Sequence, residues 1–211
     1  MSLKPINLIF IAALFAGILF FVLHRTGVTG IWSPALKGAC VALLAIWATL
    51  QARTLDGWLL AAALALGAVG DVLLETHGMI AGGTAFFGGH LVASRLYWRN
   101  REGRLWIVPA AMLATAGCAY WLVASLGSAF GIAVYAAALG LMAGTALASP
   151  FAKAGAGLGA LLFVASDLLI FAEQGPLSGS ALPGILIWPL YVAGQAAIAR
   201  GVVAMLRKQA P

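Results

Sequence analysis

Apolar residues run along this chain in long segments, which short clusters of polar residues, proline and glycine interrupt. A helix that spans a bilayer needs about 20 predominantly apolar residues. Dividing the chain at the polar clusters predicts eight such helices, and the short loops between them make successive helices antiparallel neighbours. The predicted spans are residues 6–24, 35–52, 57–74, 80–99, 105–125, 130–148, 157–174 and 184–205. The pattern therefore predicts an all-α fold, a polytopic membrane helix bundle that forms a single transmembrane domain over residues 1–211.

Composition supports this interpretation, because 63% of the 211 residues are hydrophobic and only 9% are charged. A soluble domain of this size carries about 25% charged residues. We therefore expect an integral membrane protein in contact with the lipid bilayer, in the bacterial inner (cytoplasmic) membrane. The net charge of +6 does not indicate a nucleic-acid partner, since the basic residues lie at helix ends rather than in one patch. Cys40 and Cys118 lie within apolar segments and are interpreted as small buried hydrophobic residues.

The basic residues predict an orientation in the membrane. When the chain crosses at each predicted helix, only Arg25 and Lys37 of the 12 lysines and arginines fall on one side. Cytoplasmic loops carry the excess of Lys and Arg, so the other side is cytoplasmic and both termini are predicted to lie inside. The cytoplasmic set is Lys4, Arg53, Arg95, Arg99, Arg101, Arg104, Lys153, Arg200, Arg207 and Lys208.

Two aspartates interrupt otherwise apolar spans, Asp71 in "LALGAVGDVLL" and Asp167 in "LLFVASDLLIF". Both spans run outward from the cytoplasm, which places the two carboxyl groups at similar depth in the outer half of the membrane. Carboxylates at such depth are costly and are usually functional. No lysine or arginine lies at mid-membrane to pair with them, and two neighbouring carboxyl groups would leave one protonated at neutral pH. The pair would thus supply a general acid and a carboxylate.

Four further polar residues lie inside the predicted spans and are candidates for the same site. His90, in "FFGGH", lies near mid-membrane and is the third candidate catalytic residue, with Ser94 one helical turn further on. Tyr191 and Gln195 are one turn apart on one face of the last span. Three of the four also have a structural interpretation: Ser94 and Gln195 as interhelical hydrogen-bonding residues, worth about 0.6 kcal/mol, and His90 as a buried ring bonded to a carbonyl.

Polar residues near the predicted span boundaries have simpler interpretations. Glu75 follows Asp71 by one turn, which allows a substrate-binding role or a carboxylate at the level of the lipid headgroups. Glu173 has the same headgroup interpretation, and Tyr135 is typical of an aromatic residue that anchors a helix at the interface. No metal ligand set is predicted.

The order of these motifs resembles the YhhN-type lysoplasmalogenase family of membrane proteins. The resembling segments are "GDVLL" with Asp71, "FFGGH" with His90, "LMAGTALA", "GALLFVASD" with Asp167, and "YVAGQ" with Gln195. They span most of the chain. One departure is Ala93, because the family commonly has an aromatic residue a few positions after the histidine.

The resemblance implies an eight-helix hydrolase that cleaves the vinyl ether bond of a lysophospholipid, a lysoplasmalogen, to a fatty aldehyde and a glycerophospho-base. It implies functional roles for Asp71, Asp167, His90 and Gln195, and no cofactor. Two other functions remain open on the residues alone. A proton- or cation-coupled transporter could use the same aspartates. An assembly protein would account for the many small residues but would leave the aspartates unexplained. The sequence does not indicate an oligomeric state.

Overall fold

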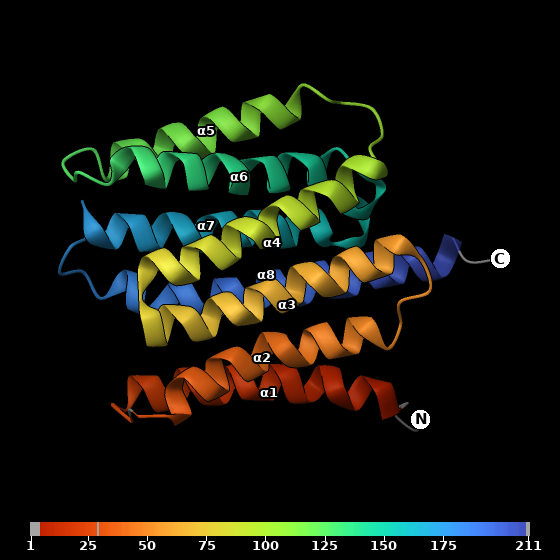
Figure 1. The fold of residues 1–211 in the computed structure, drawn as a ribbon, viewed down its shortest axis with the longest axis horizontal. Helices are drawn as coiled ribbons and strands as arrows, with labels where there is room; N and C mark the ends of the chain where they lie inside the picture. Colours follow the sequence, from red (N-terminus) through yellow and green to blue (C-terminus); the bar gives the residue numbers. More distant parts are fainter. Residues whose placement is uncertain (1–4, 29, 210–211) are drawn as a thin grey trace. The chain divides into compact units, whose positions relative to one another are not determined.

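The computed structural model of the chain describes residues 5–28 and 30–209 and contains no strand in them. The all-α prediction is confirmed (Figure 1). Lys4, one of the residues assigned to the cytoplasmic side, lies outside the described residues. The helices of the described residues are α1 (Pro5–Arg25), α2 (Trp32–Thr49), α3 (Leu55–His77), α4 (Met79–Arg99), α5 (Ile107–Leu122), α6 (Ala129–Leu147), the short 3-10 helix η1 (Pro150–Ala154), α7 (Ala156–Gln174) and α8 (Leu182–Gln209).

Each predicted span coincides with one α-helix, and the differences are at the ends. Helix α3 continues to His77, beyond the predicted end at residue 74, and only Gly78 separates it from α4. Gly78 has φ of 82°, a positive value that glycine adopts without the steric cost of a side chain. Helix α8 has 28 residues and continues through Pro189, whereas α5 is shorter than predicted, with 16 residues.

Six helices of the described part of the chain are long and apolar enough to cross a membrane: α1, α2, α3, α6, α7 and α8. Helix α4 is not among them, and its sequence contains four glycines, a histidine and two arginines. Helix α5 is apolar, but its 16 residues extend only about 24 Å at 1.5 Å per residue. The chain is an integral membrane protein, while the count of eight spans and the cytoplasmic termini stay predictions.

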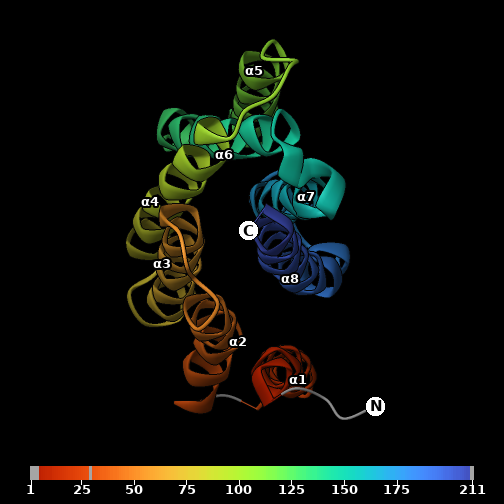
Figure 2. The ribbon, with the colours of Figure 1, turned by 90° about the vertical axis from the view of Figure 1, so that its right-hand side faces the viewer.

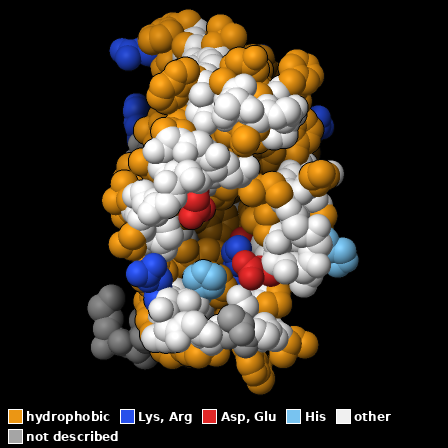
Figure 3. Space-filling model, turned by 90° about the vertical axis from the view of Figure 1, so that its left-hand side faces the viewer, with side chains coloured by type: hydrophobic (Ala, Val, Ile, Leu, Met, Phe, Trp, Pro, Cys, Tyr) orange, Lys and Arg blue, Asp and Glu red, His pale blue; other side chains and the backbone are white. Residues whose placement is uncertain are grey.

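Large hydrophobic side chains are exposed along the helices, as expected for contact with lipid. Phe15 on α1 is 65% exposed, Leu113 on α5 is 75% exposed and Trp121 near the end of α5 is 70% exposed. Figure 3 shows that hydrophobic side chains cover much of one face of the molecule, and that charged side chains on this face are few.

The chain divides into two compact units. Unit 1 comprises the described residues up to Ala93 together with those from Val202 onward, and unit 2 comprises Ser94–Gly201. Unit 1 therefore holds α1 to α3, most of α4 and the end of α8. Unit 2 holds the end of α4, α5, α6, η1, α7 and the greater part of α8.

In unit 1, successive helices pack side by side in chain order (Figure 2). The rings of Phe10 on α1 and Trp47 on α2 lie 4.9 Å apart, centroid to centroid. Small residues bring the next helices close together. A Cβ added to Gly38 on α2 would lie 2.5 Å from the Val72 side chain on α3. At Gly70, the residue before Asp71, an added Cβ would lie 2.7 Å from the ring of Phe86 on α4.

In unit 2, glycines likewise set the helix spacing. A Cβ added to Gly140 on α6 would lie 2.5 Å from the carbonyl oxygen of Ala111 on α5. Gly159 on α7 and Gly194 on α8 face each other, and a Cβ at Gly159 would lie 2.6 Å from the Gly194 carbonyl oxygen. Close approach of backbones at small residues is the usual packing device of membrane helices. It places the side chains that neighbour these glycines at helix–helix contacts.

Candidate functional site

In unit 2, Asp167 is buried on α7 and is held by a tyrosine of the preceding helix. Asp167 is 5% exposed. The hydroxyl of Tyr135 on α6 donates a hydrogen bond to Oδ2 of Asp167 at 2.7 Å. The Tyr135 ring packs edge-on against Phe171, one turn beyond the aspartate, with ring centroids 6.0 Å apart. This contact and the hydrogen bond together fix the orientation of the carboxyl group.

The residue before this aspartate connects α7 to α8. Ser166 is 1% exposed, and its Oγ donates a hydrogen bond to the carbonyl oxygen of Ile187 at 3.0 Å. The contact anchors α8 beside the segment of α7 that carries Asp167.

Tyr191 and Gln195 form the α8 part of the same unit, and both are 4% exposed. Nε2 of Gln195 donates a hydrogen bond to the Tyr191 hydroxyl oxygen at 3.3 Å, so the predicted shared face is confirmed. The Tyr191 ring packs edge-on against Phe163 on α7, with centroids 5.1 Å apart. Phe163 precedes Asp167 by one turn on the same face of α7. The aromatic contact therefore brings the Tyr191–Gln195 pair to the aspartate-bearing face.

In unit 1, Asp71 and His90 are both buried, on α3 and α4 respectively. Asp71 is 1% exposed and His90 is 3% exposed. Asp71 interacts electrostatically with Cys40, a fully buried residue of α2. His90 follows Phe86 by one turn on α4, and Phe86 packs on Gly70 beside the aspartate. The two candidates therefore lie on helices that are in contact at Gly70.

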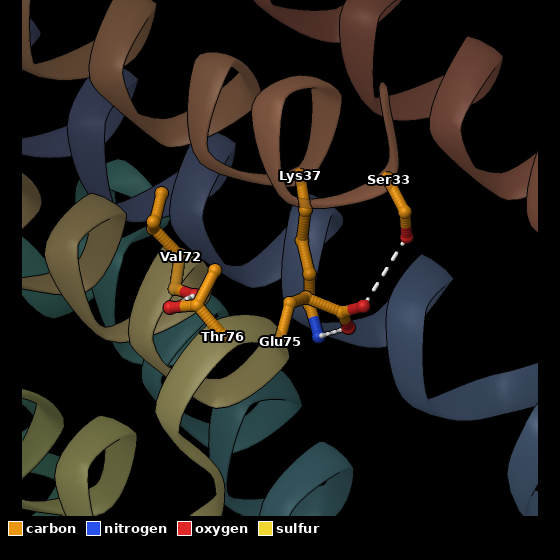
Figure 4. A network of polar contacts seen from close by, with 5 residues as sticks. All are labelled: Ser33, Lys37, Val72, Glu75 and Thr76. Atoms are coloured by element: carbon orange, nitrogen blue, oxygen red, sulfur yellow. Dashed lines mark hydrogen bonds and ion pairs between the residues drawn. The ribbon is translucent and has the colours of Figure 1, made fainter. Parts of the chain in front are cut away.

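Glu75 lies one turn from Asp71, near the end of α3, in a polar network with α2 (Figure 4). Its Oε1 accepts a bond from Nζ of Lys37 at 2.8 Å, and its Oε2 accepts from the hydroxyl of Ser33 at 3.2 Å. The side chains of Lys37 and Glu75 are 16% and 25% exposed, so the pair is partly buried and partly accessible from the surface of the unit. Glu75, for which a carboxylate at the level of the lipid headgroups was one interpretation, thus forms an ion pair with Lys37.

The seven candidate residues divide between the two units. Unit 1 contains Asp71, Glu75 and His90, and unit 2 contains Ser94, Asp167, Tyr191 and Gln195. Ser94 is 5% exposed. The roles assigned to these residues, including the pairing of the two aspartates, stay predictions.

Sequence reasoning assigned Tyr135 to the membrane interface and missed its contact with the candidate site. Tyr135 and Asp167 are 32 positions apart, and the bond depends on how α6 and α7 pack. Nothing in the local pattern around Tyr135 distinguishes it from an interfacial tyrosine. Within the described residues, no group of three or more histidines, cysteines, aspartates or glutamates could hold a metal ion.

Comparison with known proteins identifies relatives of the chain. The model of the YhhN family matches residues 32–202. The lysoplasmalogenase of Mycobacterium tuberculosis is 32% identical to this chain over 181 residues, which cover 80% of this chain and 69% of the relative. The lysoplasmalogenase of Mycobacterium bovis is similar to the same extent, at 32% identity over 181 residues. No solved structure matches the chain.

Proposed function

Because the chain belongs to the YhhN family, we propose that it is an intramembrane hydrolase that cleaves the vinyl ether bond of lysoplasmalogens. The products are a fatty aldehyde and a glycerophospho-base. Two relatives with the name lysoplasmalogenase support the substrate class. The observation that carries the proposal is a buried aspartate in each unit, Asp71 at 1% and Asp167 at 5% exposure. Carboxyl groups at membrane depth mark functional sites.

The chemistry of a vinyl ether suits two carboxyl groups. In the slow step an acid transfers a proton to the alkene carbon distal to oxygen, and the oxygen lone pair forms an oxocarbenium ion. Water then adds to the cationic carbon and gives up a proton, and the resulting hemiacetal collapses to aldehyde and alcohol. The proton is returned, so one water is consumed per turnover. The reaction needs a proton donor at neutral pH and then a negative group beside the cation.

Asp71 and Asp167 supply these two groups, the proton donor and the negative group beside the cation. A carboxylic acid kept protonated by an apolar site is strong enough to protonate the alkene. The second carboxylate stabilises the oxocarbenium ion and accepts the proton of the attacking water, as the paired carboxylates of glycosidases do. Tyr135 acts as a positioning residue, because its hydroxyl orients the Asp167 carboxyl group at 2.7 Å. No step requires a metal or an organic cofactor.

The other candidates bind the substrate or the water. His90 relays a proton or orients water, since a neutral imidazole both donates and accepts. Gln195 and Tyr191 hydrogen bond the ether oxygen or the glycerol hydroxyl, with Ser94 and Glu75 as further polar contacts. A lysolipid places its vinyl ether just below the headgroup, which agrees with the predicted depth of the aspartates in the outer half of the membrane.

The test is release of fatty aldehyde from an alkenyl-lysophospholipid by the protein purified in detergent. We expect release by the wild type and loss of about 100-fold or more in Asp71→Asn and in Asp167→Asn, each checked for folding by thermal unfolding. Glu173→Gln is the matched control, because it neutralises an exposed carboxylate near the end of the helix that carries Asp167. We expect this variant to retain full activity.

Two results would overturn the proposal. Folded wild type that releases no aldehyde from either ethanolamine or choline substrates would favour the transporter. Activity that survives in both asparagine variants would remove the aspartates from the mechanism and leave the hydrolase without its acid.

A further inference from the structure

The lysines and arginines of unit 2 all lie at one end of that unit, where α5 begins and α6 ends (Figure 1). They occur in the last turns of α4, in the connection from α4 to α5, on η1 and on α8. The connections at the opposite end, residues 123–128 and 175–181, contain no lysine or arginine. The basic residues are six in number, and all are exposed: Arg95, Arg99, Arg101, Arg104, Lys153 and Arg200.

Contacts with α6 and η1 hold the α4–α5 connection in place. The backbone nitrogen of Glu102, in this connection, donates a hydrogen bond at 2.7 Å to the carbonyl oxygen of Ala148, the residue after α6. The ring of Tyr97 near the end of α4 packs on that of Phe151 in η1, with centroids 6.0 Å apart. The arginines of the connection therefore lie beside η1, which carries Lys153.

Helix α8 reaches the same place through a close backbone contact. A Cβ added to Gly201 on α8 would lie 2.8 Å from the carbonyl oxygen of Ala154 in η1. Arg200 and Lys153 are the neighbours of these two residues in the sequence, so both lie at this helix contact. Of the three acidic residues of unit 2, which are Glu102, Asp167 and Glu173, only Glu102 lies at this end. The end of the unit thus has a large excess of positive charge.

Exposed tryptophans flank the arginines of the α4–α5 connection. The guanidinium carbon of Arg101 lies 4.6 Å from the centroid of the Trp98 ring, and Nη1 of the same arginine donates to the Trp98 carbonyl oxygen at 2.9 Å. Trp98 is 43% exposed, and Trp106, two residues beyond Arg104, is 67% exposed. Tryptophan is enriched at the level of the lipid headgroups, because its ring is apolar and its N–H is polar. The tryptophans therefore indicate that the arginines lie at the depth of the lipid phosphates.

The chemistry of these side chains matches an anionic phospholipid. A planar guanidinium binds two phosphate oxygens with parallel hydrogen bonds, and Arg101 uses only one of its five donors on the Trp98 carbonyl. Clusters of about four or more basic residues next to a membrane span attract the anionic lipids of the cytoplasmic leaflet. All six basic residues of unit 2 belong to the set that the sequence assigns to the cytoplasmic side. A soluble phosphate would have no use for the adjoining exposed tryptophans.

We propose that unit 2 binds anionic phospholipids of the bilayer through an exposed basic surface formed by Arg101, Arg104, Lys153 and Arg200. These side chains bind the headgroup phosphate, and the two tryptophans contact the glycerol and the first carbons of the acyl chains. Lipid bound in this way fixes the depth of this end of unit 2 in the membrane. The basic surface does not depend on the proposed hydrolysis, and it would stand even if the protein released no aldehyde.

The test compares phosphatidylglycerol, which is anionic, with zwitterionic phosphatidylcholine that has the same acyl chains. The full chain is purified in a neutral detergent, and native mass spectrometry counts the bound lipids and gives a dissociation constant for each. A basic side chain near the membrane surface favours an anionic lipid about fivefold. We therefore expect the wild type to bind phosphatidylglycerol about 10-fold or more tightly than phosphatidylcholine. Equal affinities would overturn the proposal.

Two substitutions test whether the α4–α5 connection and η1 belong to one surface. In Arg104→Gln and in Lys153→Gln, binding of phosphatidylglycerol should weaken about fivefold, and it should weaken further in the double variant. Binding of phosphatidylcholine should be unchanged in all three. Both side chains are exposed, so the variants should remain folded, which thermal unfolding checks. Unchanged phosphatidylglycerol binding in the double variant would remove the basic surface.

Two control variants separate lipid recognition from net charge and from a structural role. Arg25→Gln removes an exposed arginine at the end of α1 in unit 1, and it should change neither affinity. A loss as large as that in Arg104→Gln would show that net charge alone decides, and would overturn the proposal. Arg104→Lys keeps the positive charge and should retain most of the affinity for phosphatidylglycerol. A loss equal to that in Arg104→Gln, with a lower Tm, would instead indicate that Arg104 serves only the fold.

A soluble competitor distinguishes a lipid from a free phosphate ester. Glycerophosphoglycerol has the headgroup of phosphatidylglycerol without its acyl chains. We expect it not to displace the lipid at concentrations near the lipid Kd, because the contacts of the tryptophans with the lipid are lost. Displacement at such concentrations would assign the basic surface to a soluble phosphate ester and would overturn the lipid proposal.

Discussion

Tyr135 and Asp167 are joined by a 2.7 Å hydrogen bond between neighbouring helices, with the phenol as donor and the carboxylate oxygen as acceptor. The aspartate is buried and the tyrosine ring packs on Phe171, so neither side chain is free to turn toward solvent. A hydrogen bond is electrostatically stronger in such an environment than in water. The contact gives one of the two candidate catalytic carboxyl groups a defined orientation.

Replacement of Tyr135 by phenylalanine should therefore reduce catalysis more than it reduces substrate affinity. The variant keeps the ring contact with Phe171 and removes only the hydroxyl. We expect kcat for aldehyde release to fall about 10- to 100-fold, because a misplaced catalytic group is costly, while KM changes little. Steady-state assays of aldehyde release provide both constants.

The matched control for this variant is Tyr120→Phe. Tyr120 is 51% exposed on α5 of the same unit, and loss of its hydroxyl should leave both constants unchanged. Thermal unfolding of the two variants shows whether either is less stable. A kcat for Tyr135→Phe equal to that of the wild type would remove the positioning role.

Gln195 should contribute to activity beyond its contact with Tyr191. Gln195→Leu removes the Nε2 donor and preserves the approximate volume, and we expect kcat/KM to fall about 10-fold, as for loss of one substrate hydrogen bond. Tyr191→Phe removes the hydroxyl that accepts from Gln195 and that is itself a proposed substrate contact, so it should lower kcat/KM without lowering Tm. Equal losses in the two variants, with equal falls in Tm, would instead indicate that the pair serves only to pack α8.

The approach of α7 and α8 at Gly159 should be sensitive to a single methyl group. An added Cβ would lie 2.6 Å from the carbonyl oxygen of Gly194, and this backbone atom cannot move aside as a side chain can. Gly159→Ala should reduce the free energy of unfolding by about 1–3 kcal/mol. This corresponds to a fall in Tm of about 2–4 °C per kcal/mol, measured in detergent.

Gly117 provides the control for that substitution. It lies on α5, and a Cβ added there would meet no atom within 4 Å. Because alanine favours helix over glycine by about 1 kcal/mol, Gly117→Ala should be neutral or stabilising. A Tm for Gly159→Ala no lower than that of Gly117→Ala would contradict the packing seen here.

The predicted topology can be tested at α4 and α5, the two helices outside the group of six long apolar ones. Single cysteines are introduced in a variant without Cys40 and Cys118 and are labelled in intact cells with a maleimide that does not cross membranes. If both helices span the membrane, His77→Cys and Ser125→Cys should be labelled and Glu102→Cys protected. Labelling of all three positions, or protection of all three, would show that the count of eight spans is wrong.

Helix positions could be predicted from the chain because they depend on local features. Apolar length, glycine, proline and charge decide where a membrane helix begins and ends, and each of the eight predicted spans coincides with a helix of the described residues. The errors occur where local signals are weak. Polar residues after Leu74 suggested an end to the third span, but α3 continues to His77 and turns at Gly78.

The candidate site was predictable only in part. Asp71, His90, Asp167 and Gln195 stand out because a polar side chain inside an apolar run is costly, and all four are buried in the structure. Tyr135 does not stand out, since a tyrosine at the end of a span is ordinary. The ion pair of Glu75 could not be predicted from the sequence either. Its partner Lys37 is 38 positions away, and the sequence placed Lys37 only on the outer side of the membrane.

The sequence by itself determined which segments are helices, that the chain enters a membrane, and which polar residues are too costly to be incidental. These properties follow from composition and from the spacing of apolar positions along one helix. Only the tertiary structure decided that Tyr135 reaches Asp167 and that Lys37 reaches Glu75. Both contacts depend on the rotation and depth of one helix against the next. For Lys37 and Glu75 they are set in part by the close approach of Gly38 on α2 to Val72 on α3, and the sequence within one helix carries no information about its partner.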